Sequence, residues 1–243
     1  MKRLLAIVAG GVLAAGLVAQ AADPVYSVNA VGYAKLSLPA GFSMISLPFN
    51  AVGGNATTIG GVFPYGTVQD STTIFFYMPG AGYAAYTFVD NGLGDPASGW
   101  WGPTDTSSPT GGSNAILRGE GFWIQVPGAT NIVLAGEVPG ASNGTNTVPL
   151  VTGFQMVSFA YPATGSVTNG LAPSDGDTIF SWTGSSWQTY SYVYSPGDPA
   201  DTGWYDNNNS VFVPDVALKV GAGYWYQSSQ SMSWNQTKPY QWP

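Results

Sequence analysis

The chain has 243 residues, of which 8% are charged, and its 13 acidic and 6 basic residues give a formal net charge of −7. Nucleic acids and anionic membrane surfaces are bound by clusters of Lys or Arg, so the composition argues against both partners. The sequence contains no histidine and no cysteine, which excludes a Ser-His-Asp triad, a thiol nucleophile and disulfide bonds.

Residues 1–21 have the pattern of a cleaved secretory signal peptide. Lys2 and Arg3 precede an apolar run from Leu4 to Val18, and small residues follow it. The run is short for a membrane span, and no second run of about 18 apolar residues follows it. We therefore expect a secreted protein without a membrane span, located at the surface of a bacterium or outside it.

Short runs of apolar and alternating residues, separated by Gly, Pro, Asn and Ser, continue through the mature chain. Such runs are typical of β-strands. They occupy residues 33–38, 42–49, 73–78, 83–89, 121–126 and 131–138. After Ala22 no window keeps a helical period with capping signals, so the sequence predicts an all-β fold.

Five sequence blocks occur twice, in the same order, which indicates an internal duplication. The matched pairs are 41–49 with 153–161, 73–75 with 178–180, 83–88 with 187–192, 94–101 with 197–205, and 115–123 with 217–225. A period near one hundred residues suits a whole small domain. We predict two tandem homologous β-sandwich or barrel-like domains, at residues 22–139 and 150–243, joined by a junction at 140–149.

The last of these blocks contains GEGFW, repeated as GAGYW. Adjacent residues of a strand point to opposite faces, so one ring of each pair should fill the core and the other should meet its surroundings. The glycines would supply a turn or bulge. We interpret the motif as structural, and its residues are Gly119, Gly121, Phe122, Trp123, Gly221, Gly223, Tyr224 and Trp225.

Residues 25–39 form a β-prone arm ahead of the first repeated block. The arm includes Val28, Val31 and Tyr33. The favoured interpretation is an edge strand of the first domain. The alternative is an arm that completes the sheet of a neighbouring subunit.

Six tryptophans outside the GEGFW and GAGYW motifs are candidates for contact with a partner, because Trp is enriched at interfaces and its flat ring suits the face of a sugar. They could equally be core residues. The candidates are Trp100, Trp101, Trp187, Trp204, Trp234 and Trp242.

Acidic residues suggest two further kinds of site. Asp95, Asp198, Asp201 and Asp206 lie in loops of a kind that can hold calcium, although Asp also simply forms turns and the turn interpretation is favoured. Glycosidases need two placed carboxyl groups, but the only glutamates are Glu120 and Glu137. We expect no enzyme, an aspartate-based hydrolase being the remaining enzymatic alternative, and no cofactor apart from the calcium hypothesis.

The segments VNAVGYAKLSLPAGFSMISLPF (28–49) and LRGEGFWIQVPGATNIVLAGEVP (117–139) resemble exported repeat proteins of Verrucomicrobia and related bacteria. Mature chains of that group begin near NAVGY and continue with GFxMIS and GxGFW blocks. The resemblance is weaker in the second unit, where Ala222 replaces Glu120 and the AGEV close is lost. It implies export and a repeat architecture, and it carries over no activity.

From these observations we expect a secreted structural or adhesive protein, which self-assembles into a fibre or a surface layer. A surface with few ions can be buried against a neighbour at lower cost. The expected partner is the protein itself. The alternative is a carbohydrate-binding module that uses exposed aromatic residues on an extracellular polysaccharide.

Overall fold

The computed structural model describes residues 30–54, 57–140 and 144–241, which form an almost entirely β protein. The predicted signal peptide, Val28 and Trp242 lie outside these residues. The first half contains β1 (Val31–Leu38), β2 (Gly41–Ser46), α1 (Ile59–Val62), β3 (Thr73–Met78), β4 (Gly82–Val89), β5 (Gly99–Trp101), β6 (Gly121–Val126) and β7 (Thr130–Glu137).

The second half contains β8 (Thr145–Leu150), β9 (Gly153–Ser158), β10 (Gly165–Ser166), β11 (Thr178–Trp182), β12 (Trp187–Val193), β13 (Gly203–Asp206), β14 (Val211–Val213), β15 (Ala217–Leu218), β16 (Gly223–Ser228) and β17 (Met232–Thr237). Short 3-10 turns lie at Val52–Gly54, Gly111–Ser113 and Pro199–Asp201. The all-β prediction is confirmed, and each of the six predicted strands overlaps an observed one.

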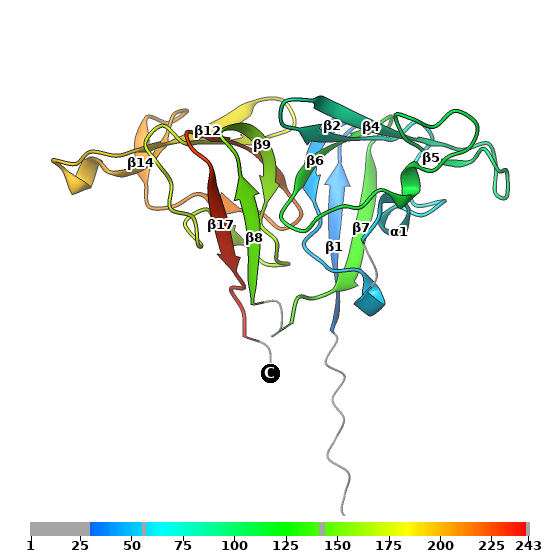
Figure 1. Ribbon diagram of the computed structural model, residues 1–243, viewed down its shortest axis with the longest axis horizontal. Coiled ribbons are helices and arrows are strands. Elements are labelled where there is room, and N and C mark those ends of the chain that lie inside the picture. The colour runs from blue at the N-terminus through cyan, green and yellow to red at the C-terminus, as the bar shows by residue number, and fades with distance from the viewer. Residues whose placement is uncertain (1–29, 55–56, 141–143, 242–243) are drawn as a thin grey trace, which may run out of the picture.

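The two large antiparallel sheets have the same strand order. The order is β2-β6-β3-β4-β5 in the first half and β9-β16-β11-β12-β13 in the second, where β14 adds a sixth strand. A two-stranded sheet accompanies each, β1 with β7 and β8 with β17. The large sheets lie next to each other, the two-stranded sheets lie beneath their centre, and β14 and β5 lie at opposite ends (Figure 1). The repeated order agrees with a duplication, while the domain boundaries remain a prediction.

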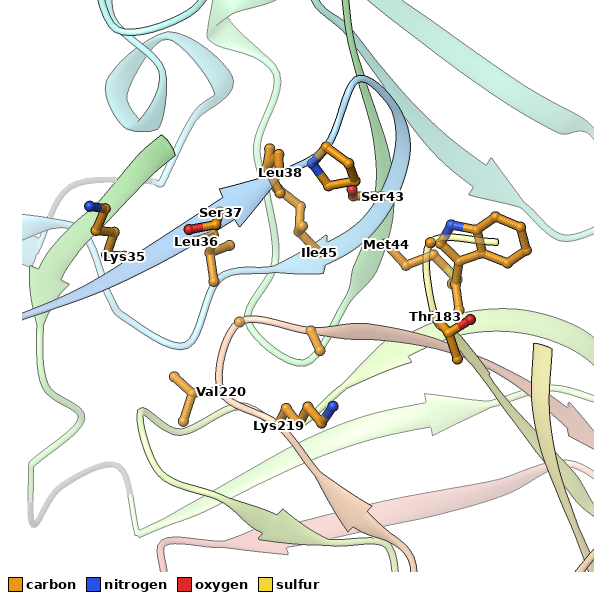
Figure 2. Close-up of a pocket in the computed structure, with 15 residues that line it drawn as sticks. Lys35, Leu36, Ser37, Leu38, Ser43, Met44, Ile45, Thr183, Lys219 and Val220 are labelled. Atoms are coloured by element: carbon orange, nitrogen blue, oxygen red, sulfur yellow. The ribbon is translucent and has the colours of Figure 1, made fainter. Parts of the chain in front are cut away.

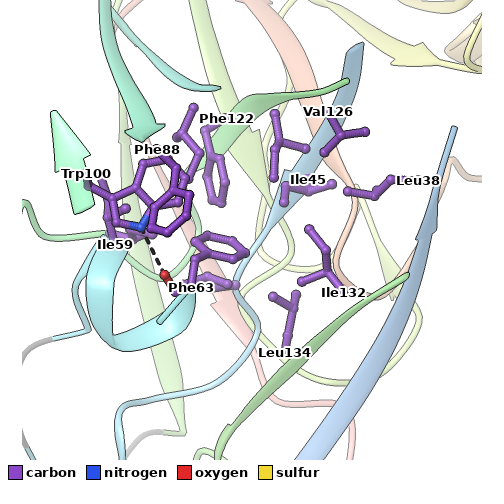
Figure 3. Packing of buried hydrophobic residues seen from close by; sticks show 14 of the residues in the cluster. Leu38, Ile45, Ile59, Phe63, Phe88, Trp100, Phe122, Val126, Ile132 and Leu134 are labelled. Atoms are coloured by element: carbon purple, nitrogen blue, oxygen red, sulfur yellow. Dashed lines mark hydrogen bonds between the residues drawn. The ribbon is translucent and has the colours of Figure 1, made fainter. Parts of the chain in front are cut away.

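Each half buries its own hydrophobic core between its large sheet and its two-stranded sheet. In the first half, Ile132 and Leu134 of β7 belong to one cluster with Ile45 and Phe122 of the large sheet (Figure 3). A second cluster is built from residues between Val148 and Tyr240, with Ala222 among the side chains packed against it. Burial of apolar surface is the main favourable term in folding, and here it acts without any disulfide.

The single turn α1 was not expected, because IGGV is too short and too rich in glycine to show a helical period. Thr58 caps it by accepting a hydrogen bond from the amide of Gly61 at 3.2 Å. The next residue, Phe63, supplies the carbonyl that accepts the indole N–H of Trp100 at 2.9 Å (Figure 3). The equivalent Trp204 has a buried indole nitrogen without a hydrogen-bond partner among the described residues.

Residues 145–149, assigned to the junction from the sequence, instead form most of β8. They pair with β17 from Thr145 opposite Thr237 to Pro149 opposite Ser233. Val148 and Leu150 are buried, so the strand contributes to the second core. The Pro/Gly/Ser/Asn composition misled the prediction, because proline is compatible with an edge strand, where its missing N–H faces away from the ladder.

The N-terminal arm pairs within the chain over the residues that the structure describes. Val31 lies opposite Glu137 and Tyr33 opposite Ala135 in the antiparallel β1–β7 pair. This is the edge-strand arrangement. Among the described helices, none is long and apolar enough to cross a lipid bilayer.

Candidate functional site

The alternation of side chains along the strands places aromatic rings on both faces of each large sheet. In β3, Ile74 and Phe76 point into the core, so Phe75 and Tyr77 point to the opposite face. In β6, Phe122 is buried in the core and its neighbour Trp123 lies on the outer face. The same pattern holds in β16, where Tyr224 is buried and Trp225 is only partly covered.

Ten outward rings form one continuous group, which we call the aromatic face. Neighbouring ring centroids lie between 4.7 Å (Tyr77 and Trp225) and 6.5 Å (Tyr83 and Trp225) apart, in tilted or edge-to-face geometry. Such pairs add stability beyond the burial of their area. The ten residues are Phe42, Phe75, Tyr77, Tyr83, Trp123, Phe154, Phe180, Trp182, Trp187 and Trp225.

The contacts of the aromatic face have an approximate twofold symmetry that matches the repeated sequence blocks. Trp123 of the first half contacts Trp182 and Trp187 of the second. In the matched positions, Trp225 of the second half contacts Tyr77 and Tyr83 of the first. Each half therefore packs its GxG(F/Y)W tryptophan against a pair of neighbouring rings of the other half.

Hydrogen bonds beneath the aromatic face repeat the same symmetry, and we call this contact the seam. The amide of Ser46 donates to the carbonyl of Gly221 at 2.9 Å, and the amide of Ser158 donates to that of Gly119 at 2.8 Å. The serine hydroxyls also donate across the seam, Ser46 Oγ to the carbonyl of Ala222 (3.1 Å) and Ser158 Oγ to that of Glu120 (3.2 Å). The two halves are thus joined by backbone as well as by rings.

The glycines of the repeated motif have two different roles at the seam. Gly119 and Gly221 have φ angles of 90° and 72°, so they form the turn that the sequence predicted for glycine. Gly121 and Gly223 lie within β6 and β16 and are needed for close approach. A Cβ on Gly121 would lie 2.6 Å from the carbonyl oxygen of Val157, and one on Gly223 would lie 2.8 Å from that of Ile45.

The aromatic face is open to solvent and carries no charge. Tyr83 is 50% exposed, Phe42 46%, Phe154 45% and Trp187 37%. The strands that bear the ten rings (β2, β3, β4, β6, β9, β11, β12 and β16) contain no Asp, Glu, Lys or Arg. Exposed apolar patches of this kind mark contact sites for proteins or ligands.

A groove of about 520 Å³ lies on this face where the two halves meet. Its lining combines aromatic rings from both halves with the side chain of one threonine. The lining residues are Tyr77, Tyr83, Phe154, Phe180, Trp187, Thr189 and Trp225. The hydroxyl of a tyrosine is neutral at physiological pH and can donate a hydrogen bond, and partial burial raises the pKa of Tyr83 further above its usual value.

A smaller cavity of about 310 Å³ lies at the seam beside β1. Leu36 and Ile45 of the first half lie on one side of it, and Lys219 and Val220 of the second half lie on the other (Figure 2). Leu36 also lies against Gly221, where it would meet an added Cβ at 2.9 Å. We regard this cavity as part of the seam between the halves.

The structure separates the tryptophans that the sequence proposed as contact residues. Trp100, Trp204 and Trp234 are buried in the cores, which corrects their assignment, because a buried ring cannot stack on a ligand. Trp101 is partly covered at the β5 end of the first sheet, and its indole N–H donates to the carbonyl of Ala97. Trp187 belongs to the aromatic face.

Most residues of the aromatic face were not proposed from the sequence. Trp123 and Trp225, interpreted there as structural, lie at its centre. The recurrence of aromatic residues at the outward-pointing positions of the strands could have revealed the face. Phe42 matches Phe154 in the repeated blocks, and Phe75 matches Phe180.

The candidate metal-binding aspartates act within turns. Asp95 accepts the amide of Ala97 at 2.7 Å, and Asp198 accepts that of Ala200 at 2.9 Å. Asp206 accepts the side-chain amide of Asn209, which is the main cause that lowers its pKa, as well as the backbone amides of Asn208 and Asn209 and the side chain of Gln188. Asp201 ends a 3-10 turn. Within the described ranges, no three acidic side chains lie close enough together to hold a metal ion.

Comparisons of this chain with protein-family models, with curated proteins and with solved structures give no match.

Proposed function

We propose that this chain is an exported structural or adhesive protein that holds to extracellular material through the aromatic face. The observation that carries the proposal is the uncharged group of ten rings that spans both halves. Desolvating an uncharged, largely apolar surface costs little, so contact with another surface leaves a net gain from burial. The predicted signal peptide supports the location outside the cell.

The acidic residues best suited to catalysis are engaged in the fold, which supports a role without turnover. Glu120 accepts the amide of Leu117 at 3.2 Å, and Glu137 accepts that of Gly53 at 2.9 Å. Burial raises the pKa of Glu120, but it lies on the turn at the seam. The proposal therefore assigns the protein a binding role and no reaction.

Adsorption to the insoluble envelope of the producing bacterium tests the proposal. We expect the mature chain to sediment with this material, and the double variant Tyr83→Ser/Trp187→Ser to bind at least about tenfold more weakly, since aromatic anchors dominate contact energies. The control is Leu93→Ser, which removes an apolar side chain that is 86% exposed and is not one of the ten residues of the face. Equal adsorption of the double variant and the native chain would contradict the proposal.

Self-assembly is a second candidate function, and the free edge of β14 is the observation that favours it. This strand ends the six-stranded sheet, and its Val211 and Phe212 are exposed. An unprotected apolar edge can pair with another copy. Electron microscopy should then reveal fibres or lattices of the native chain that Val211→Lys abolishes, whereas assemblies that persist in this variant exclude the β14 edge.

A further inference from the structure

We infer that the groove on the aromatic face binds a chain of an uncharged polysaccharide. This inference rests on the proposed adhesive function and names its ligand. The groove volume of about 520 Å³ lies within the usual range of small-molecule sites. Tyr83, Phe154 and Trp187 are each more than a third exposed, so the groove is open along the face and suits a segment of a longer chain.

The lining has the two kinds of group that a sugar needs. A pyranose ring has apolar C–H faces, which pack on aromatic rings, and a rim of hydroxyls, which need hydrogen-bond partners. Trp187 and Trp225 provide the largest ring surfaces in the lining, and each also carries an indole N–H donor. The hydroxyls of Tyr77, Tyr83 and Thr189 lie in the same lining.

Charge decides between neutral and acidic polysaccharides. No lining residue is charged, and the whole chain has a net charge of −7. Uronate or sulfate groups would therefore meet no cation in the groove and would be repelled by the protein as a whole. A neutral chain needs no such partner and keeps its hydrogen bonds at the rim.

The two halves differ in the rings around the groove, and this difference provides a matched control for binding. The tyrosines Tyr77 and Tyr83 lie beside Trp225, whereas the bulkier Trp182 and Trp187 occupy the equivalent places beside Trp123. The groove is accordingly lined by Phe154 and Trp225 and not by their counterparts Phe42 and Trp123.

Phe154 and Phe42 allow the groove to be separated from the rest of the face. They are equally exposed, at 45% and 46%, and lie opposite Gln227 and Gln125 on the neighbouring strands. Both also contact the repeat tryptophan and the β3 or β11 phenylalanine of their own half. Truncating either ring should therefore affect folding similarly.

Isothermal titration calorimetry with the full mature chain provides the test. The probes are the neutral hexasaccharides cellohexaose, mannohexaose, xylohexaose and chitohexaose, with hexagalacturonate as the anionic comparison. We expect at least one neutral probe to bind and to shift tryptophan fluorescence. Phe154→Ala should weaken this binding by about tenfold or more, and Phe42→Ala by less than about twofold.

Three results would overturn the inference. These are the absence of binding by every neutral probe at millimolar concentration, equal binding of hexagalacturonate, or equal effects of Phe154→Ala and Phe42→Ala. Sedimentation velocity adds a fourth, because self-association that Phe154→Ala abolishes would assign the groove to a second copy. If the envelope adsorption described above remains sensitive to Tyr83→Ser/Trp187→Ser while no neutral probe binds, the adhesive function survives and only the ligand is wrong.

Discussion

Replacing Asp177 with alanine should lower the free energy of unfolding by about 3 kcal/mol, because it leaves the buried hydroxyl of Tyr226 and two partly buried amides without an acceptor. The Asp177 carboxylate is fully buried. It accepts the hydroxyl of Tyr226 at 2.8 Å, the amide of Ser229 at 2.7 Å and the amide of Ser174 at 2.9 Å. Urea denaturation followed by tryptophan fluorescence would measure the loss.

The duplication supplies the control for this experiment. Thr72 is the counterpart of Asp177. The carbonyl oxygen of Thr72 accepts the amide of Phe88 at 2.8 Å, and that of Asp177 accepts the amide of Tyr192 at 2.7 Å. The Thr72 hydroxyl is buried without a partner among the described residues. Thr72→Val should therefore be neutral or slightly stabilising, and a loss comparable to that of Asp177→Ala would contradict the argument.

Gly223→Ala should lower the free energy of unfolding by about 3 kcal/mol, because the added methyl group meets backbone that cannot easily move. The new Cβ would lie 2.8 Å from the carbonyl oxygen of Ile45 and 3.3 Å from the Cα of Gly121. Relief of these contacts requires the two halves to separate at the seam. Urea denaturation measures the change, with Gly197→Ala as the control, since a Cβ there meets nothing within 4 Å.

A double substitution of Gly121 and Gly223 tests whether the two glycines act at the same contact. Gly121 faces Gly223 across the seam, and its own Cβ would lie 3.2 Å from the Cα of Gly223. One separation of the halves would relieve both substitutions, so Gly121→Ala/Gly223→Ala should cost less than the sum of the single variants. Additive losses would show that the two positions are relieved independently.

The strands, and the placement of successive side chains on opposite faces of them, could be predicted from the sequence. The alternation in GFWIQV is enough to place Phe122 and Trp123 on opposite faces, and the structure has them so. The turn glycines Gly119 and Gly221 follow from the same motif. Local patterns suffice here, because strand geometry fixes the direction of successive side chains.

The seam and the aromatic face could not be predicted in this way. Alternation shows that Trp100 and Trp101 point in opposite directions, but it cannot say which direction is the core when both residues are aromatic. The close approach at Gly121 depends on Val157, which belongs to the other half. Such contacts depend on how two distant segments pack, which no local pattern encodes.

The continuous chain has a further consequence for the seam. Two separate copies of such a unit would associate only above their dissociation constant, whereas a tether gives the two surfaces a high effective concentration that does not change with dilution. Because Ser46, Gly221, Ser158 and Gly119 belong to one polypeptide, their hydrogen bonds form within a single molecule. The paired rings therefore stay assembled in arbitrarily dilute solution.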